Sequence, residues 1–320
     1  MIALETFVDL SIVIPLLNEE DNIPPLYQSL KAVLDEMAIK YEIIIIDDGS
    51  TDRSYEILKE LAAGDKSLKV IRFRRNFGQT AGLAAGFDEA QGDVVITMDA
   101  DLQNDPEDIP KLLEKINEGY DLVAGWRYDR QDAEISRKLP SRIANALISK
   151  TTDVKLHDYG CTLKAFRKEV VKNINLYGEL HRFIPAIASW MGVKIAEVKV
   201  NHHARIHGES KYNISRTPRV LLDLFTVKFL LSYSAKPLQF FGKFGLISGG
   251  VGFLLMVWLI LQRLFTDTPL ADKPSLLIAI MLILVGVQFI SFGLLGEMMT
   301  RTYHETQKKS VYVVRDILNG

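Results

Sequence analysis

Two aspartates separated by one residue are the clearest candidates for chemistry in this sequence. Asp99 and Asp101 directly follow an apolar, β-branched stretch, VVITM. Two carboxylates at this spacing repel each other unless a cation or a hydrogen-bond donor offsets their charge, and a hard divalent ion with oxygen ligands does so. The pattern predicts a site for Mg²⁺ or Mn²⁺ that also bridges a substrate diphosphate. Because Asp-x-Asp alone is a common spacing, its position after a strand carries the prediction.

Two further polar clusters follow apolar stretches earlier in the chain. Residues 10–16 lead into Asn18-Glu19-Glu20, and residues 42–47 lead into a run that ends in Gly49-Ser50-Thr51-Asp52. Residues of these types often only cap the next helix, as Thr51 or Asp52 could do here. The second cluster is therefore open to a capping interpretation as well as to a functional one.

These clusters need a scaffold that brings them to one place. Strand patterns cover residues 10–16, 42–47, 68–73, 94–98 and 121–124, and helix patterns lie between them near residues 22–38, 53–63, 79–91 and 106–118. Strands and helices that alternate at this spacing predict an α/β domain with a mostly parallel sheet and helices on both faces. Ligands bind such sheets beyond the carboxyl ends of the strands, where the polar clusters gather.

The composition divides the chain into a polar part and an apolar part. Mean hydropathy is +0.09 although 24% of the 320 residues are charged, and residues 244–320 hold 11 of the 78 charged residues. Two charge-free stretches, 244–262 and 274–296, reach the roughly 20 residues that a membrane-spanning helix needs. The alternative, two buried core helices, is disfavoured because neither stretch has a polar face.

Charge and cysteine content exclude other classes of protein. The formal net charge is −2, which gives no overall field of the kind that nucleic-acid binding uses. Cys161 is the only cysteine, so an intrachain disulfide and a cysteine-based zinc site are both excluded.

The charges that flank the apolar stretches predict an orientation. Residues 199–243 hold eight Lys/Arg and two acidic residues, and residues 215–234 interleave basic and apolar side chains. The positive-inside rule then places both ends of the chain in the cytoplasm, and a basic amphipathic helix should lie on the membrane surface, unless it is an ordinary domain helix. We expect a cytoplasmic catalytic domain over 1–214, interface helices over 215–243, a two-helix transmembrane anchor over 244–300 and a cytoplasmic tail over 301–320.

Together these stretches resemble the polyisoprenyl-phosphate glycosyltransferases, a group of family-2 inverting glycosyltransferases that includes dolichol-phosphate mannose synthase and bacterial undecaprenyl-phosphate glucosyl- and aminoarabinosyl-type transferases. The stretches that carry the resemblance are SIVIPLLNEEDNI, IIIIDDGSTD, RRNFGQTAGLAAGF, MDADLQNDPEDI, DYGCTLKAFR and GEMMTRTYHETQKKSVYVVRD. They cover nearly the whole chain. The resemblance implies a GT-A type, Rossmann-like fold and transfer of a sugar from a UDP- or GDP-linked donor to undecaprenyl or dolichyl phosphate.

The resemblance also implies roles for individual residues. The nucleotide-sugar site would comprise Pro15, Leu17, Glu19, Ile46, Asp48, Asp99, Ala100, Asp101, Arg205 and Lys211. The acceptor phosphate would be bound by Arg127, Arg137 and Ser141, and Mg²⁺ or Mn²⁺ by Asp101 and Gln103. Asp101, Arg127 and Asp158 would be the catalytic residues. Asp158 is equally well explained as a turn residue before Gly160.

Two alternatives remain at this point. A processive polysaccharide synthase shares the acidic clusters, but Trp190 lacks the Gln-x-x-Arg-Trp context and only two spans follow. An inactive membrane adaptor that binds a nucleotide or lipid is disfavoured by the intact acidic and basic sets. The sugar and the base are not determined by the sequence. The resemblance suggests a homo-oligomer such as a tetramer, and the small residues Gly245, Gly249, Gly250, Gly252 and Gly286 permit close helix contacts within or between chains.

Overall fold

The computed structural model describes residues 8–128, 154–174, 176, 180–189, 191–204, 237–266, 273–306 and 311–320. The chain divides into two compact units, Met1–Val227 with Ser310–Gly320, and Lys228–Lys309. The expected interface helix over 215–234 lies outside the described residues, as do four expected site residues: Arg137, Ser141, Arg205 and Lys211.

Within the described residues, the first unit is built on one sheet of eight strands in the order β7-β5-β6-β4-β1-β2-β3-β8. The strands are β1 Leu10–Leu16, β2 Tyr41–Asp47, β3 Leu68–Phe73, β4 Val94–Thr97, β5 Leu122–Arg127, β6 Lys164–Arg167, β7 Ile195–Val200 and β8 Val314–Leu318. Strands β4, β1, β2 and β3 pair in parallel, as do β5 and β7, whereas β6 and β8 run antiparallel to their neighbours. The expected mostly parallel sheet is confirmed.

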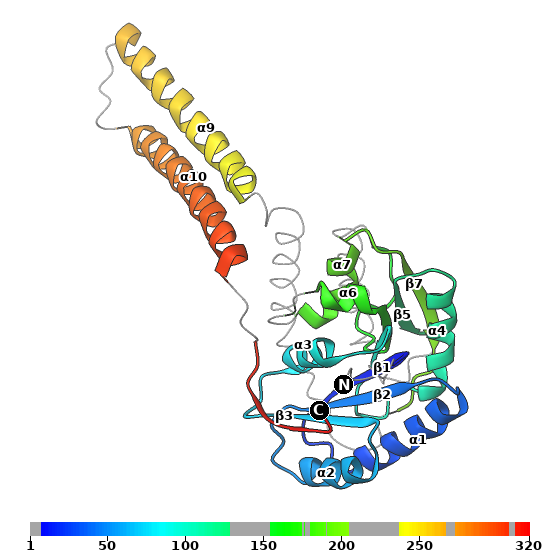
Figure 1. Cartoon of the computed structure of the whole chain (residues 1–320). Coiled ribbons are helices and arrows are strands. Elements are labelled where there is room, and N and C mark those ends of the chain that lie inside the picture. Colours follow the sequence, from blue (N-terminus) through cyan, green and yellow to red (C-terminus); the bar gives the residue numbers. More distant parts are fainter. Residues whose placement is uncertain are drawn as a thin grey trace. The chain divides into compact units, whose positions relative to one another are not determined.

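Helices cover both faces of this sheet, which explains why its central strands are apolar throughout. The helical elements of the unit are α1 Ile23–Glu36, α2 Ser54–Gly64, α3 Gln79–Glu89, η1 Pro106–Asp108, α4 Ile109–Asn117, α6 Lys168–Lys172, η2 Leu180–Phe183 and α7 Ile184–Ser189. Apolar side chains of α1, α2 and α4 form one core with the sheet, whereas α3 and α6 lie on the other face, where Phe87 meets Phe166 (Figure 1).

Helix α3 packs unusually close to β1. A Cβ atom at Gly86 would lie 2.1 Å from Val13, and one at Gly82 would lie 2.8 Å from Pro15. These glycines therefore allow the helix backbone to approach the strand. As a result, the first residues of α3, Gln79 and Thr80, lie at the carboxyl edge of the sheet.

The end of the chain returns to the first unit as an edge strand, which we did not expect. Residues 301–320 were expected to form a tail, but β8 pairs antiparallel with β3. Tyr312 stacks on Phe73 with ring centroids 5.1 Å apart, and the Asn319 amide donates to the carbonyls of Ala62, Asp65 and Leu68. The side chains of this five-residue strand are largely exposed, so the strand can carry charged residues. Its sequence therefore lacks the apolar pattern from which a strand is predicted.

In the part of the second unit that the structure describes, there are two long apolar helices, α9 Pro237–Thr266 and α10 Pro274–Thr306. Segments Leu238–Thr266 and Pro274–Gly296 are long and apolar enough to cross a membrane, and few of their residues are buried inside the protein. Both expected spans thus lie in single helices, and residues 237–243, expected at the interface, belong to α9. The two helices pack closely within the chain, since a Cβ atom at Gly286 would lie 2.7 Å from the Gly249 nitrogen.

Candidate active site

The carboxyl ends of β1, β2 and β4 bring the predicted acidic clusters to one edge of the sheet. Pro15 pairs with Ile46 in the β1–β2 register, and Asp99-Ala100-Asp101 follow β4 beside them. Ile46, Asp48 and Asp101 are buried, with exposed fractions of 0, 4 and 8%. Leu17 and Glu19 lie half-buried in the loop after β1. The structure therefore gathers the predicted nucleotide-sugar residues of the described ranges at one place.

Asp48 organises the loop that precedes α3. Its carboxylate accepts hydrogen bonds from the backbone nitrogens of Phe77 at 2.7 Å and Gly78 at 2.9 Å. Burial raises the pKa of Asp48 above its usual range, although these two hydrogen bonds favour the charged form. Its neighbour Asp47 accepts from the Ser50 nitrogen at 2.8 Å. Both aspartates therefore fix the backbone of neighbouring loops through hydrogen bonds.

The capping interpretation accounts for another part of the same cluster. Helix α2 has Arg53 at its N-cap position, without a side-chain hydrogen bond from that residue. The side chain of Asp52 accepts from the nitrogen of Ser54 at 3.0 Å, within the first turn. Capping therefore explains Asp52 but not the buried Asp48.

Asp99 is held by hydrogen bonds to both of its carboxylate oxygens. The Gln79 amide donates to one oxygen at 2.8 Å and the Thr162 hydroxyl donates to the other at 2.7 Å. Burial, followed by the negative charge of Asp101, raises the pKa of Asp99 above its usual range. Asp101 accepts from the Gln103 backbone nitrogen at 3.2 Å across a turn in which Leu102 has φ = 60°. The two carboxylates are thus fixed close together despite their repulsion.

This arrangement fits a divalent ion that is shared with a substrate. Within the described ranges no three His, Cys, Asp or Glu side chains converge in a way that could hold a metal on their own. Mg²⁺ typically binds through one or two carboxylates, several waters and the phosphate oxygens of a substrate. Asp101, with Gln103 beside it, fits this mode, and a cation there would offset the charge that raises the pKa of Asp99.

Arg127 and Asp158 form a two-pronged ion pair at the end of β5. The Arg127 Nε donates to Asp158 at 2.6 Å and its Nη2 donates at 2.9 Å, with 14 and 10% of the two side chains exposed. Burial disfavours the charge of Arg127, but Asp158 outweighs that effect and raises the pKa of Arg127. Asp158 also accepts from the Gly160 nitrogen at 3.2 Å. The turn interpretation of Asp158 is therefore correct, and the same carboxylate also orients Arg127.

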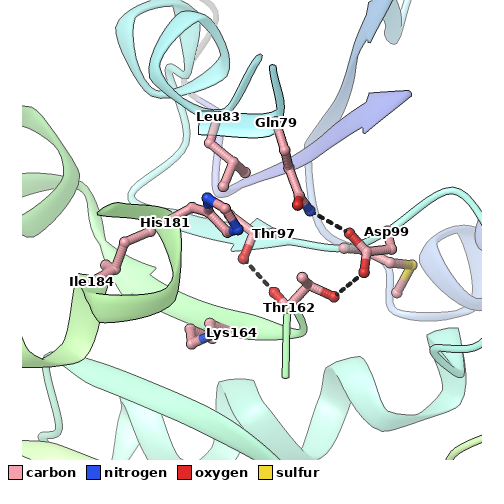
Figure 2. A pocket seen from close by; sticks show the side chains of 9 residues that line it. Gln79, Leu83, Thr97, Asp99, Thr162, Lys164, His181 and Ile184 are labelled. Carbon is pink, nitrogen blue, oxygen red and sulfur yellow. Dashed lines mark hydrogen bonds between the residues drawn. The ribbon is translucent and has the colours of Figure 1, made fainter. Parts of the chain in front are cut away.

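Four residues beside Asp99 were missed by the sequence analysis. Gln79, Thr162, Lys164 and His181 line a small hollow next to this carboxylate (Figure 2). Gln79 could have been found, because it stands directly after the Asn-Phe-Gly of a stretch that carries the resemblance. His181 gave no signal, since its partner Thr80 is 101 positions away in the sequence.

The fold and the site together define a class of protein. A mostly parallel α/β sheet with an Asp-x-Asp pair at its carboxyl edge is the architecture of GT-A type glycosyltransferases. The family model described as "Glycosyl transferase family 2" matches residues 11–174, which covers β1 to α6. The chain belongs to glycosyl transferase family 2.

Curated relatives match nearly the full length of the chain. A dodecaprenyl-phosphate galacturonate synthase of Rhizobium johnstonii is 42% identical over 316 residues, covering 98% of this chain and 94% of that protein. An undecaprenyl-phosphate 4-deoxy-4-formamido-L-arabinose transferase of Edwardsiella ictaluri is 39% identical over 318 residues, covering 99 and 96%. The similarity thus includes both the sheet and the apolar helices.

Solved structures share the fold over much of the chain. A glucosyl-3-phosphoglycerate synthase from Mycobacterium tuberculosis, crystallised with Mn²⁺, UDP and glucosyl-3-phosphoglycerate, superimposes with a TM-score of 0.55. It is 19% identical in sequence, and the match covers 70% of this chain and 80% of that one. At this identity the likeness concerns the fold alone.

Proposed function

We propose that this protein transfers a sugar from a nucleotide sugar to the phosphate of a polyprenyl phosphate, with inversion at the anomeric carbon. The observation that carries the proposal is the full-length similarity to two transferases whose names specify dodecaprenyl and undecaprenyl phosphate. The described geometry supports it, because acidic residues for a nucleotide diphosphate and a cationic side chain for a second phosphate lie at the same sheet edge. The enzyme is accordingly a hexosyltransferase-type enzyme that forms a polyprenyl-phosphate monosaccharide.

A phosphate acceptor makes a strong general base on the protein unnecessary. A phosphate monoester has a second pKa of about 6, so at neutral pH the attacking oxygen is already mostly deprotonated. A strong general base is therefore unnecessary, and catalysis depends on alignment and on charge stabilisation. This agrees with the Arg127–Asp158 pair, in which the carboxylate is committed to a guanidinium.

Arg127 is the described residue best suited to orient the acceptor phosphate. Its planar guanidinium is held in one direction by two hydrogen bonds to Asp158, which leaves the remaining donors of the fork in a fixed orientation. Asp158 then acts through Arg127, as a positioning residue. Arg137 and Ser141 would complete this acceptor site, and Arg205 and Lys211 would lie around the donor phosphates.

A divalent ion would be held by Asp101 with Gln103. When bound, Mg²⁺ or Mn²⁺ supplies positive charge that stabilises the leaving nucleoside diphosphate. The crystallised glucosyl-3-phosphoglycerate synthase contains Mn²⁺ and UDP, which supports a divalent ion at a nucleotide site of this fold. Asp48, Pro15 and Ile46 would line the adjacent nucleotide pocket, and Asp99 with Ala100 would contact the donor.

The two apolar helices support a reaction at a membrane. A polyprenyl acceptor keeps its tail in the bilayer, so its phosphate lies at the interface, where α9 and α10 would hold the enzyme. By the charge distribution, both ends and the first unit face the cytoplasm. The close glycine contacts of α9 and α10 are made within one chain, and we expect homo-oligomers to form through other surfaces.

The proposal is tested with the purified full-length protein. It is incubated with undecaprenyl phosphate, Mg²⁺ or Mn²⁺ and a panel of UDP- and GDP-sugars, and lipid products are identified by mass spectrometry. We expect one sugar to give a polyprenyl-phosphate monosaccharide that contains a single sugar unit. Products with many sugar units would indicate a processive enzyme instead, and no product from any donor would contradict the proposal.

A further inference from the structure

We propose that Tyr312, in the segment of the chain that follows the apolar helices, is a positioning residue for nucleotide binding. The inference rests on the proposed function, because it concerns the nucleotide of the donor. Tyr312 stands shortly after α10 ends at Thr306 and just before β8, which Figure 1 shows in dark red beside β3. None of the expected site residues lies in this part of the chain, so the role is assigned from contacts in the structure.

Tyr312 begins a row of aromatic side chains that leads to the loop between β3 and α3. Its ring stacks on the ring of Phe73, the last residue of β3, with the centroids 5.1 Å apart and the planes inclined by 17°. Phe73 is buried, and its ring meets the ring of Phe77 edge to face at 5.7 Å. Aromatic pairs at these separations attract each other beyond the effect of burial alone. The position of Phe77 therefore depends on Tyr312 through one intervening ring.

Hydrogen bonds tie the same segment to both elements that flank this β3–α3 loop, residues 74–78. The backbone nitrogen of Arg74, the first loop residue, donates to the carbonyl of Val313 at 3.1 Å. The Tyr312 hydroxyl donates to the carboxylate of Asp88, on α3, at 2.7 Å. Tyr312 thus contacts the strand before the loop with its ring and the helix after the loop with its hydroxyl. Removal of this side chain would loosen both elements between which the loop is held.

The β3–α3 loop also contacts the residues that we assign to the nucleotide. The backbone nitrogens of Phe77 and Gly78 donate to the carboxylate of Asp48. A Cβ atom at Gly49 would lie 2.6 Å from the carbonyl carbon of Arg75, so the turn after Asp48 packs directly against the loop backbone. A shift of the loop would therefore also move the Asp48 carboxylate.

The end of the loop is connected to a second carboxylate of the site. Gly78 has φ = 94°, a backbone conformation that favours glycine, and the next residue, Gln79, donates to Asp99 at 2.8 Å. The loop thus holds Asp48 directly and Asp99 through Gln79. Arg127, assigned to the acceptor, ends β5, and four strands lie between β5 and β3 in the sheet. Because affinity depends on the exact placement of binding groups, loosening the loop should weaken nucleotide binding and spare acceptor binding.

The test compares nucleotide affinity between Tyr312→Ala, Tyr312→Phe and wild type. UDP and GDP are titrated with Mn²⁺ into the purified full-length protein by calorimetry, which reports the Kd separately from the number of sites, so partial unfolding lowers only that number. We expect the Kd to rise about five- to tenfold in Tyr312→Ala, and less than about threefold in Tyr312→Phe, which keeps the stacked ring and loses the hydroxyl. Val313→Ala is the matched control, with a Kd within about twofold of wild type. Its side chain is exposed, and the substitution keeps the carbonyl that accepts from Arg74.

Steady-state kinetics give a second readout. The KM for the nucleotide sugar should rise together with the Kd, whereas the KM for the lipid acceptor should stay within about twofold, a split that a general loss of stability would not produce. Tyr312→Leu keeps apolar bulk without the stacked ring and replaces Tyr312→Ala if that variant fails to fold. An unchanged Kd in the folded variants, or an equal rise of both KM values, would overturn the inference. A wild type that binds neither UDP nor GDP would contradict the proposed function itself.

Discussion

The two ends of the sheet shift the pKa values of their aspartates in opposite directions. At the amino-terminal end, where β2 and β3 begin, Lys31 lies 3.3 Å from both Asp35 and Asp65. Burial acts to raise the pKa of Asp65, but hydrogen bonds from Tyr27 and Ser67 outweigh it and lower that pKa to about 2. At the carboxyl end the pKa values of Asp48 and Asp99 are raised.

At the amino-terminal end the charged groups stabilise the fold, whereas at the carboxyl end they are suited to binding a ligand. The carboxylates of the amino-terminal end are matched by a lysine and by neutral donors, so their charge is favoured. Asp99 and Asp101 crowd two negative charges together, which costs stability unless a cation joins them. Carboxylates held in an unfavourable state in this way are typical of functional sites. The comparison therefore supports our proposal that the chemistry takes place at the carboxyl end of the sheet.

The largest effect is expected for Asp101→Asn. The change removes the carboxylate assigned to the divalent ion but keeps the size of the side chain, so transfer to polyprenyl phosphate should fall by about 100-fold or more. The measurement is the rate of formation of labelled lipid product in membranes. Asp65→Asn serves as the control at the other end of the sheet and should keep its turnover. An equal loss of transfer rate in both variants would contradict the assignment of the active site to the carboxyl end.

A smaller loss is expected for Asp158→Asn. Arg127 would keep its position in the sequence but lose its charged partner, so transfer should fall by about 10- to 100-fold, mainly through a higher KM for the lipid acceptor. Breaking a largely buried ion pair also destabilises the protein, by about 3 kcal/mol. Steady-state kinetics with each substrate varied separate the two KM values. A rise confined to the KM of the nucleotide sugar would assign the pair to the donor side.

The smallest effect is expected for Asp65→Asn, and it concerns stability. Loss of a charged acceptor for Tyr27 and Lys31 should lower the free energy of unfolding by about 1–2 kcal/mol near pH 7. Because the pKa of Asp65 is lowered from 3.8 to about 2 on folding, its stabilisation is complete above pH 4 and is lost as the pH falls through that interval. Urea unfolding at several pH values should show the difference between wild type and variant shrinking below pH 4. A constant difference would contradict the charged role of Asp65.

Much of the scaffold could be predicted because its signals are local. The apolar runs of β1 and β3 give their bounds without error, and the bounds of β2 and β4 differ from the expected ones by a single residue. Asp99 and Asp101 stand directly after such a run, so their place at the sheet edge follows from strand order alone. The spans were visible for the same reason, as uninterrupted apolar stretches.

The remaining features depend on contacts between distant parts of the chain. The pairing of Arg127 with Asp158 joins residues 31 positions apart, and the contact of His181 with Thr80 joins residues 101 positions apart. Neither leaves a pattern in the neighbouring sequence. Strand β8 was missed for two reasons. It lies far from its partner β3 in the sequence, after the two apolar helices, and it carries Arg315 and Asp316 in its middle.

Binding of a nucleoside diphosphate tests most directly the claim that the carboxyl end of the sheet is the active site. UDP and GDP are titrated into the purified protein by calorimetry, with Mn²⁺ or with a chelator, for wild type and Asp101→Asn. The account predicts that one of the two nucleotides binds wild type with Mn²⁺ and that binding weakens at least about tenfold with the chelator or in the variant. Equal affinity in all conditions would contradict it.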